Sequence, residues 1–249
     1  MIFPFPRRKE LNVVLFTSIF STDKTLTEIT LKTSFIVRTL SIFRVSNLYF
    51  IDDLKDPEIK KTITDIINYA LLPPYLKKKM PLKATLKKAG LINPVNIPSH
   101  IVEKDAVEGE YRIGEEGDFG LKNKIKSKSR VILVINSNPL KIKPYDFFPY
   151  YEGFKIKFLE QDQVFSLKNL IIGSRSGKNP FDEISKIREL YEKYGISLLI
   201  GPPQGGVLKN IKIKNYDYIY NFIPNQGVKD VRAEEALLAS LTVLNYILG

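Results

Sequence analysis

The chain contains no cysteine and a single histidine among its 249 residues. Without cysteine it has no disulfide framework, no thiolate metal ligand and no thiol nucleophile. One imidazole also argues against zinc catalysis and against a Ser-His-Asp mechanism. We therefore expect no metal centre, and we interpret His100 as a loop residue rather than a metal ligand.

Long hydrophobic runs are missing as well. No window approaches the roughly 18 uninterrupted apolar residues of a membrane span. The opening residues, MIFPFPRRKE, lack the apolar segment and small-residue cleavage site of a signal peptide. The sequence therefore predicts a soluble, cytoplasmic protein with no membrane partner.

Negative charge is scarce relative to positive charge. The chain has 38 Lys and Arg against 27 Asp and Glu, which gives a formal net charge of +11. A surplus of this size favours a polyanionic partner, because each phosphate contact releases condensed counterions. General lysine enrichment that serves only solubility is the alternative.

Short apolar runs alternate with amphipathic segments at both ends of the chain, which predicts a parallel α/β fold. The expected strands are 11–16, 47–51, 167–172, 196–200 and 216–222. The expected helices are 25–43, 57–71 (with Pro57 in its first turn), 181–194 and 231–248.

The middle of the chain has a different pattern. A basic stretch broken by Pro81 covers residues 76–88, and short strand-like runs separated by turn residues follow as far as residue 159. Examples are the runs at 131–135 and 154–158. Turn signals every eight to twelve residues are typical of a small β-barrel or meander. We therefore predict an all-β insertion at 90–160 within a discontinuous α/β domain formed by 1–89 and 161–249.

Three Gly- and Pro-rich loops follow strands in the last third of the chain: GSRSG (173–177), GPPQGG (201–206) and IPNQG (223–227). Glycine lets a backbone approach a ligand, and loops that follow parallel strands gather at the carboxyl edge of the sheet. Neither G-x-G-x-x-G nor G-x-x-x-x-G-K-[ST] occurs. From the residues alone, a ligand cleft and ordinary strand-to-turn junctions both remain open.

The tail resembles a known family. IGPPQGG, followed by NFIPNQGVKDVRAEEALLASLTVLN, is similar to the C-terminal signature of the SPOUT (α/β-knot) RNA methyltransferases. The closest resemblance is to the archaeal and eukaryotic subgroup that carries an inserted OB-like domain. YLKKKM, KKAGLINPVNIPSH, YYEGFKIKF and IIGSRSGKN support it, so the resemblance touches most of the chain, although the insertion matches only loosely.

The resemblance implies a deep C-terminal trefoil knot, an OB-like insertion and a homodimer in which each subunit completes its partner's site. It also implies that the three loops wrap S-adenosylmethionine, with adenine held by backbone groups and apolar side chains. The implied cofactor-binding residues are Gly173, Ser174, Ile200, Gly201, Pro202, Gly205, Gly206, Ile223, Pro224, Asn225, Gln226, Gly227, Ala236 and Leu237.

Methyl transfer from a sulfonium is an in-line displacement, so it depends mainly on alignment of the nucleophile with the methyl group. We interpret Arg232 and Glu234 as catalytic candidates, because a carboxylate can accept a proton and a guanidinium can stabilise negative charge. Each has a plainer explanation. Glu234 in a first helical turn complements the helix dipole, and Arg232 could form a surface ion pair.

Basic residues form the predicted RNA-binding set. Lysines alternate with other residues along 121–130, which on a single strand would place them on one face. A turn at KSKS would interrupt that row. The predicted RNA contacts are Lys77, Lys78, Lys79, Lys122, Lys124, Lys126, Lys128, Arg130 and Arg175.

The sequence therefore predicts an S-adenosylmethionine-dependent RNA methyltransferase. The resemblance favours base methylation in ribosomal RNA, at uridine N3, with ribose 2′-O methylation second. A ribosome-assembly factor that keeps the fold without turnover is the rival from another class. A nucleotide-binding metabolic enzyme fits the positive charge poorly.

Overall fold

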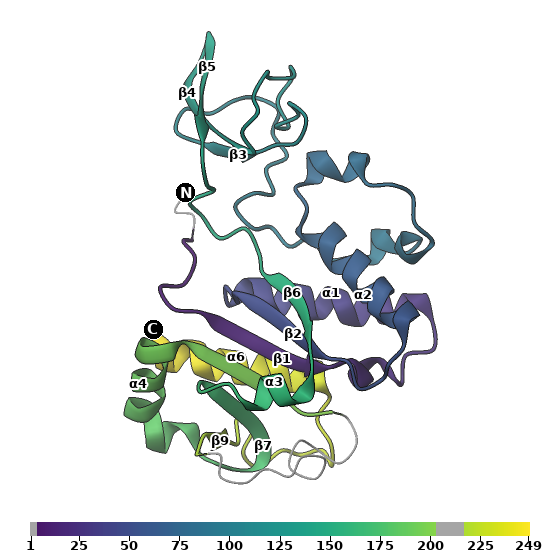
Figure 1. Cartoon of the computed structure of the whole chain (residues 1–249), viewed down its shortest axis with the longest axis vertical. Helices are drawn as coiled ribbons and strands as arrows, with labels where there is room; N and C mark the ends of the chain where they lie inside the picture. Colours follow the sequence, from purple (N-terminus) through teal and green to yellow (C-terminus); the bar gives the residue numbers. More distant parts are fainter. Residues whose placement is uncertain (1–3, 203–216) are drawn as a thin grey trace.

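The computed structural model describes residues 4–202 and 217–249. Within them, six strands form one sheet in the order β6-β2-β1-β8-β7-β9, and every neighbouring pair is parallel (Figure 1). This confirms the predicted α/β class with a mostly parallel sheet. The strands are β1 (Leu11–Phe16), β2 (Asn47–Ile51), β6 (Lys155–Leu159), β7 (Leu170–Lys178), β8 (Ile196–Ile200) and β9 (Ile219–Tyr220).

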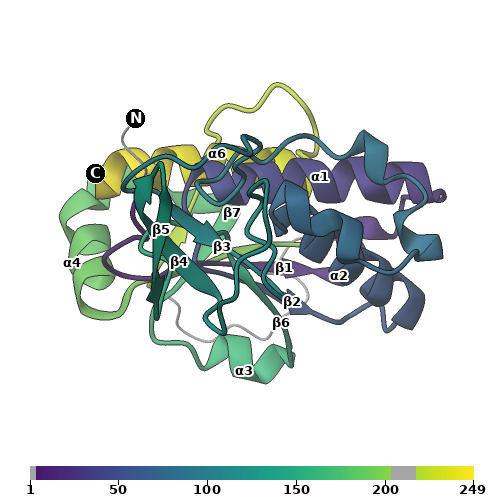
Figure 2. The same ribbon diagram turned by 90° about the horizontal axis from the view of Figure 1, so that it is seen from above.

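Helices cover the two faces of this sheet unequally. In Figure 2 helices α1 and α6 run along one side of the sheet and α3 lies on the other. The α-helices are α1 (Leu26–Ile42), α2 (Pro57–Leu71), α3 (Gln161–Phe165), α4 (Ile184–Tyr194) and α6 (Ala233–Leu248). Short 3-10 helices are η1 (Thr17–Phe20), η2 (Pro74–Lys79), η3 (Ala84–Leu86), η4 (Ala89–Leu91) and η5 (Pro180–Glu183).

Local sequence explains where the first two long helices begin. The Thr25 hydroxyl accepts the amide of Glu28, whose carboxylate accepts the amide of Thr25 at 2.8 Å, so the two residues form a capping box. Asp56 accepts the amides of Glu58 and Ile59 ahead of Pro57, the first residue of α2. Both starts agree with the sequence prediction to within one residue.

Strand alternation divides the buried side chains into two cores. Val13 and Leu15 of β1 face the larger core, which α1, α2, α4 and α6 complete. Val14 and Phe16 face a smaller core on the opposite face, where Val164 of α3 packs. All six residues of β1 are buried, as expected for a central strand of a parallel sheet.

The middle of the chain forms a second, antiparallel sheet in the order β3-β4-β5. Its strands are β3 (Tyr111–Ile113), β4 (Val131–Ser137) and β5 (Leu140–Tyr145). The run expected at 154–158 also forms a strand, but it pairs with β2 in the parallel sheet and not with the antiparallel strands. Its pairing could not be read from periodicity, because short apolar runs look alike in both kinds of sheet.

Segment η2 joins the two sheets. The Tyr75 hydroxyl donates to the Ile113 carbonyl at 2.5 Å, and the Tyr75 ring occupies the space beside Gly120, which has φ +73°. A Cβ at Gly120 would lie 2.4 Å from that ring, so only glycine fits there. Lys78 forms a 2.7 Å ion pair with Asp118. The antiparallel sheet is therefore fixed against the helical layer by a hydrogen bond, close packing and an ion pair.

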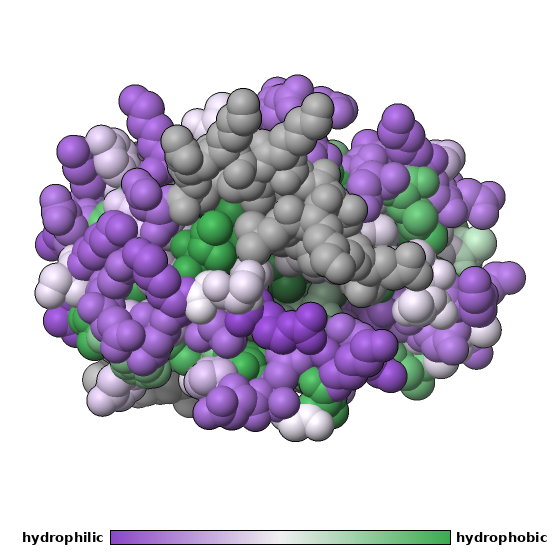
Figure 3. All heavy atoms as spheres, turned by 90° about the horizontal axis from the view of Figure 1, so that it is seen from below, coloured by the Kyte–Doolittle hydropathy of each residue, from purple (hydrophilic) through white to green (hydrophobic). Residues whose placement is uncertain are grey.

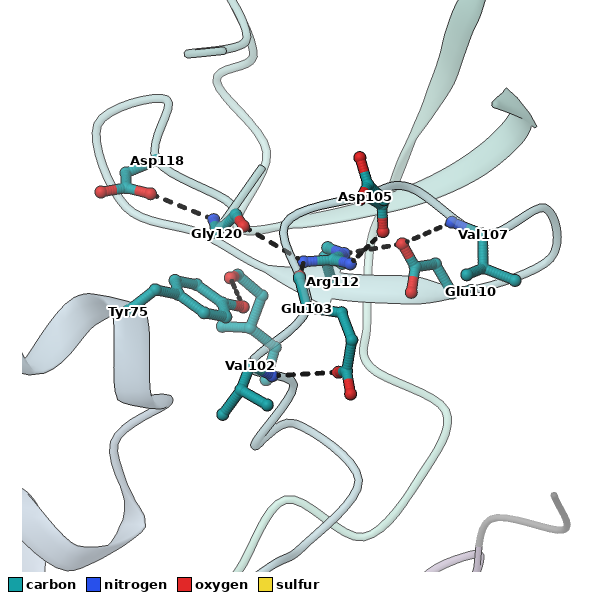
Figure 4. A network of polar contacts seen from close by, with 10 residues as sticks. Tyr75, Val102, Glu103, Asp105, Val107, Glu110, Arg112, Asp118 and Gly120 are labelled. Atoms are coloured by element: carbon teal, nitrogen blue, oxygen red, sulfur yellow. Dashed lines mark hydrogen bonds and ion pairs between the residues drawn. The ribbon is translucent and has the colours of Figure 1, made fainter. Parts of the chain in front are cut away.

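A buried arginine organises the loops around β3. The Arg112 side chain is fully buried, and its Nε pairs with Glu110 at 2.7 Å. Its other nitrogens donate to the carbonyls of Glu103, Asp105 and Gly120, as Figure 4 shows. A buried guanidinium is tolerated because its donors are paired in this way. Arg112 thus ties the loop before β3 and the loop after it to that strand.

The structure bears on the sequence expectations for His100, for metal binding and for membrane-spanning helices. His100 lies in a turn, and its ring Nε2 is 3.1 Å from the carbonyl oxygen of Leu71; burial lowers its pKa. In the part of the chain that the structure describes, no group of His, Asp or Glu is arranged to hold a metal ion. No helix within 4–202 or 217–249 is long and apolar enough to cross a membrane.

We predict that Arg112→Ala destabilises the protein by about 3 kcal/mol or more, because it removes one partner of a buried ion pair and leaves three loop carbonyls without a donor. Urea unfolding followed by circular dichroism measures this loss. The matched control is Arg130→Ala, whose 2.7 Å pair with Glu152 is exposed and should be worth about 1 kcal/mol or less. Equal effects of the two substitutions would contradict the role assigned to Arg112.

Candidate functional site

The three strands that precede the predicted loops meet at the carboxyl edge of the sheet. Gly173 of β7 pairs with Ile200 of β8 on one side and with Tyr220 of β9 on the other. A Cβ at Gly173 would lie 3.1 Å from Ile200 Cδ1 and 3.8 Å from the Phe222 ring. The structure therefore brings the starts of all three loops into one row, where parallel sheets bind ligands.

The GSRSG segment differs from the prediction in one respect. Strand β7 does not end at residue 172 but runs on to Lys178, and both Gly173 and Lys178 pair with Tyr220. The intervening residues Ser174–Gly177 therefore form a bulge between two pairing positions. A Cβ at Gly177 would lie 2.5 Å from the Tyr220 carbonyl carbon, so glycine allows β9 to approach this closely.

Hydrogen bonds join this bulge to the segment after β9. Asn221 Nδ2 donates to the Arg175 carbonyl at 3.0 Å, and Arg175 Nη1 donates to the Lys229 carbonyl at 2.8 Å. Asn221 Oδ1 in turn accepts the amide of Ile223 at 3.0 Å. Arg175 is exposed, so its remaining donors face solvent. The predicted RNA contact thus also holds two of the predicted loops together.

The IPNQG loop contains one amide side chain that is bonded within the loop and another that is exposed. Gln226 Nε2 donates to the carbonyls of Val228 and Lys229, so this amide shapes its own loop. Asn225 is exposed and has φ +56°, a left-handed conformation that asparagine tolerates. Pro224 and Gly227 are exposed as well. Of the two amides predicted to contact a ligand, Asn225 is the one whose side chain the loop leaves available.

At the start of α6, the two catalytic candidates Arg232 and Glu234 differ from their neighbour Glu235 in structural role. The Arg232 amide donates to Glu235 Oε2 at 3.0 Å, so Glu235 caps the helix. Arg232 is exposed and Glu234 is partly buried in the first turn. Glu235 therefore caps the helix, while Glu234 lies in the first turn, where a carboxylate complements the helix dipole as the sequence indicated.

The other predicted cofactor residues lie in three settings. Leu237 is fully buried in the larger core, with Ala236 packed against that core. Gly201 and Pro202 are partly exposed directly after β8. Gly205 and Gly206 fall outside the described residues.

The sequence analysis missed a polar cluster beside this row. The Tyr220 hydroxyl donates to Glu183 Oε2 at 2.7 Å, and Lys178 pairs with Glu183 Oε1 at 2.8 Å. Lys186 lies 3.5 Å from the same carboxylate. The Lys178 bond, followed by the Tyr220 bond, lowers the pKa of Glu183 to about 2. No sequence motif indicates this cluster, because its members come from four elements, β7, η5, α4 and β9, that only the fold brings together.

The carboxyl ends of β1 and β2 are closed by their own side chains. Thr17 Oγ1 donates to Asp53 Oδ1 at 3.1 Å. Asp53 Oδ1 also accepts the Ser18 amide at 2.9 Å. Asp52 accepts the Lys55 amide and lies 3.6 Å from the Lys60 ammonium. These bonds satisfy the turn locally.

The predicted RNA-binding lysines lie elsewhere. Residues 121–130 lie in the loop that joins β3 to β4, so they do not form the single-strand row, in line with the interruption expected at KSKS. Their exposure nevertheless alternates, because Lys124, Lys126 and Lys128 are exposed while Ile125, Ser127 and Ser129 are partly buried. Lys122 pairs with Asp105, and Arg130 pairs with Glu152. The three central lysines have no ion pair within the described residues.

The three lysines of η2, which were predicted to contact RNA, contact other residues of the protein. Lys77 lies over the Tyr69 ring at 4.7 Å, and burial lowers its pKa. Lys78 and Lys79 pair with Asp118 and Glu116. In Figure 1 the antiparallel sheet lies at the opposite end of the molecule from β7 and β9. The structure therefore does not gather the predicted lysines around the predicted cofactor loops.

The lower face of the molecule, seen in Figure 3, is the one nearest β7 and β9. Hydrophilic residues dominate it, and a few hydrophobic residues reach the surface between them. Among the exposed apolar side chains of the chain are Val228, in the segment before α6, and Phe181 in η5.

Comparison with known proteins gives a family match over part of the chain. A family model described as "Putative RNA methyltransferase" matches residues 10–131, just under half of the chain. The match covers β1, α1, β2, α2 and β3, and it ends before β7, β8 and β9.

Two relatives, both named as uncharacterized proteins, are similar to most of this chain. The one from Haloarcula marismortui is 24% identical over 264 residues, covering 87% of this chain and 92% of that protein. The one from Halobacterium salinarum is 23% identical over 261 residues, covering 86% and 91%. Among solved structures, a "putative methylase family protein" from Neisseria gonorrhoeae covers 96% of this chain and 81% of its own, with 8% identity and a TM-score of 0.38. At that score the likeness supports no inference.

We predict that Glu183→Gln destabilises the protein at neutral pH and that the difference from wild type disappears in acid. The carboxylate is stabilised by Lys178 and Tyr220, so its pKa falls from 4.5 to about 2. Its contribution to the free energy of unfolding is therefore complete above pH 4.5 and is lost as the pH falls through about 2. Thermal unfolding of both proteins between pH 7 and pH 2 measures it. A difference that stays constant over this range would contradict the cluster's role.

Proposed function

We propose that this protein is an S-adenosylmethionine-dependent RNA methyltransferase of the cytoplasm. The observation that carries the proposal is the match of residues 10–131 to an RNA methyltransferase family model. Three loops at one carboxyl edge and a net charge of +11 support it independently, because they suit a cofactor cleft and a polyanionic substrate.

We assign the cofactor to the row where Gly173, Ile200 and Tyr220 meet. Ile200 and Phe222 pack close to Gly173 and form an apolar wall, and adenine binds well against such a wall with backbone groups at its edge. Ser174, Gly201, Pro202, Ile223, Pro224, Asn225, Gln226 and Gly227 complete the proposed site, with Gly205, Gly206, Ala236 and Leu237 as further contacts. In this proposal the chain around β9 also forms the deep trefoil knot of the SPOUT fold.

For the reaction we propose methylation of uridine N3 in ribosomal RNA. Uridine N3 carries a proton that must leave before or during attack on the methyl group, and negative charge then develops on the ring oxygens. Glu234 would accept the proton and Arg232 would stabilise the charge. Both residues stand at the start of α6, directly after the loop that we assign to the cofactor.

Residues 90–160 are the proposed RNA-binding insertion. Only three strands, β3, β4 and β5, pair with one another there, fewer than the five of an OB-fold, while β6 (Lys155–Leu159) belongs to the parallel sheet. The OB-like character and the domain boundaries at 89–90 and 160–161 therefore belong to this proposal. Arg175, Lys77, Lys78, Lys79 and the basic loop from Lys122 to Arg130 supply the proposed phosphate contacts. Two alternatives remain, namely ribose 2′-O methylation and a ribosome-assembly role without turnover.

Incubation with tritiated S-adenosylmethionine tests the proposal. Bulk RNA from a strain that lacks the gene should become labelled, and nucleoside analysis should place the label in 3-methyluridine. Label in a 2′-O-methylated nucleoside would favour the first alternative. RNA binding without any label would favour the assembly role.

We predict that Arg232→Ala and Glu234→Gln each lower methyl transfer by roughly 100-fold or more, as expected when a positioned acid–base or electrostatic group is lost. Cofactor affinity measured by calorimetry should change little for Arg232→Ala. The matched control is Glu189→Gln, an exposed carboxylate of α4, which should transfer at the wild-type rate. Near wild-type rates for both variants would refute the catalytic assignment and leave the cofactor site untouched.

We further propose a homodimer, because α1 and α6 leave apolar side chains uncovered. Leu31, Phe35 and Ile42 are exposed along one stripe of α1, and Leu238 and Tyr246 along one stripe of α6. The two helices contact each other on the same face of the sheet. A stripe that faces away from its own core on a packed helix suits a partner subunit.

Light scattering at tens of micromolar should therefore give twice the mass of the chain. Leu238→Glu combined with Tyr246→Glu should shift the protein toward the monomer, because two carboxylates would have to be desolvated in the interface. The control pair Val102→Glu and Val107→Glu changes two exposed apolar residues of the insertion and should leave the mass unchanged. A monomeric wild type would contradict the dimer.

A further inference from the structure

An unbroken run of aromatic rings crosses the insertion and reaches the N-terminal segment. In order, its members are Phe147, Tyr145, Tyr111, Tyr150 and Phe5. Successive ring centroids are 5.3, 5.1, 5.9 and 5.5 Å apart. The three tyrosines are partly buried, and the phenylalanines at the two ends of the run are 61% and 60% exposed.

Strand register places the middle of this run on one face of the antiparallel sheet. Tyr145 lies opposite Val131, and Tyr111 lies opposite Leu133, which lies opposite Lys143. Directly opposed residues share a face, so Tyr111, Lys143 and Tyr145 stand on the same side. The other side of the sheet carries Arg112 and is covered by the loops that this arginine binds. The aromatic side also carries Ile113 and Val131, which are buried in a small core with Phe148. A partner can therefore reach this side at Lys143, which is exposed, and at the tyrosines, which are partly exposed.

Two exposed lysines lie on the strand that carries Tyr145. Lys141 and Lys143 alternate with their neighbours along β5, so they share the face of Tyr145. Both are exposed and form no ion pair within the described residues. This is unlike Lys78, Lys79 and Lys83, each of which holds a carboxylate.

A hydrophobic core alone does not explain these features. The small core of the insertion consists of Ile113, Val131 and Phe148, against which Tyr111, Tyr145 and Tyr150 pack. Phe147 and Phe5 lie at the ends of the run and add little to that core, since most of each ring is in water. Exposed rings beside unpaired lysines are what unpaired bases require, because every base has a face that can stack and a phosphate that attracts cations.

We propose that the run from Phe147 to Phe5, together with Lys141 and Lys143, binds single-stranded RNA, with bases stacked on the exposed rings and phosphates on the lysines. This proposal rests on the proposed function, because it assumes that the polyanionic partner is RNA. It adds that the protein selects single-stranded RNA. A duplex hides its base faces and cannot use the rings. The backbone bond from the Tyr151 amide to the Pro4 carbonyl, 2.9 Å long, anchors the Phe5 end next to the parallel-sheet domain. The run therefore leads bound RNA from the insertion toward that domain.

Fluorescence anisotropy with a labelled ten-nucleotide oligouridylate and with a duplex of matched length tests the proposal on the full chain. The wild type should bind the single strand more tightly than the duplex. Phe147→Ala should weaken single-strand binding roughly 5-fold or more, as for loss of one stacking partner, and leave duplex binding unchanged. Phe181→Ala is the matched control, since this ring of η5 is 49% exposed but lies outside the run. It should bind as the wild type does.

The lysines give a second, independent measurement. Lys141→Gln with Lys143→Gln should reduce the slope of log affinity against log salt by about 1.4, which corresponds to two phosphate contacts on a single strand. The control pair Lys168→Gln and Lys193→Gln, both exposed in the parallel-sheet domain, should keep the wild-type slope. Because all four lysines and both phenylalanines are exposed, the variants should fold. Circular dichroism of each variant checks that it keeps the wild-type secondary structure.

The results separate this inference from the proposed methyl transfer. Selective loss in Phe147→Ala supports the inference even if the wild type transfers no methyl group. Unchanged single-strand affinity in Phe147→Ala together with an unchanged salt slope in the lysine variant overturns it, even if methyl transfer is robust. A wild type that prefers the duplex also overturns it.

Discussion

The common direction of the six strands is the constraint on which the rest of the structure depends. Because every pair is parallel, the segments after β7, β8 and β9 leave the sheet at one edge. The close approach of β9 to β7 is permitted by Gly177, whose missing Cβ leaves room for the Tyr220 backbone. Glu183 then holds the Tyr220 hydroxyl from η5. A short strand of two residues is thereby kept in register, and the loop that follows it stays beside GSRSG.

Much of the parallel domain could be predicted because its signals are local. The apolar runs of β1, β2 and β8 appear in the structure at the predicted residues. The capping residues Thr25 and Asp56 mark the starts of α1 and α2. For elements of this kind, hydrophobic period and capping chemistry depend only on neighbouring residues, so the sequence carries them directly.

What could not be predicted depends on contacts between distant segments. The run at Lys155–Leu159 reads as another strand of the insertion, yet it pairs with β2, more than 100 positions earlier in the chain. The Glu183 cluster and the aromatic run from Phe147 to Phe5 are likewise assembled from separate segments. Within the candidate site, the resemblance indicated the loops, but only the fold shows that Gln226 binds a carbonyl of its own loop and that Glu235 caps α6.

The molecule thus has two regions of different chemistry. The carboxyl edge at β7 and β9 is shaped by Gly173 and Gly177, which suits a small cofactor. The insertion carries a run of edge-to-face aromatic rings beside exposed lysines, which suits a strand of RNA. Segment η2 fixes the two parts together through Tyr75 and Lys78, so an RNA held by the insertion would keep a defined position relative to the edge.

The central claim is that the loops after β7 and β9 hold S-adenosylmethionine. Hydrogen–deuterium exchange, followed by mass spectrometry with and without saturating S-adenosylmethionine, measures this directly. The claim predicts slower exchange in peptides that cover residues 173–178 and 221–232, with no change at residues 52–56 after β2. Unchanged exchange in both loop regions, or protection confined to the β2 end of the edge, would contradict it.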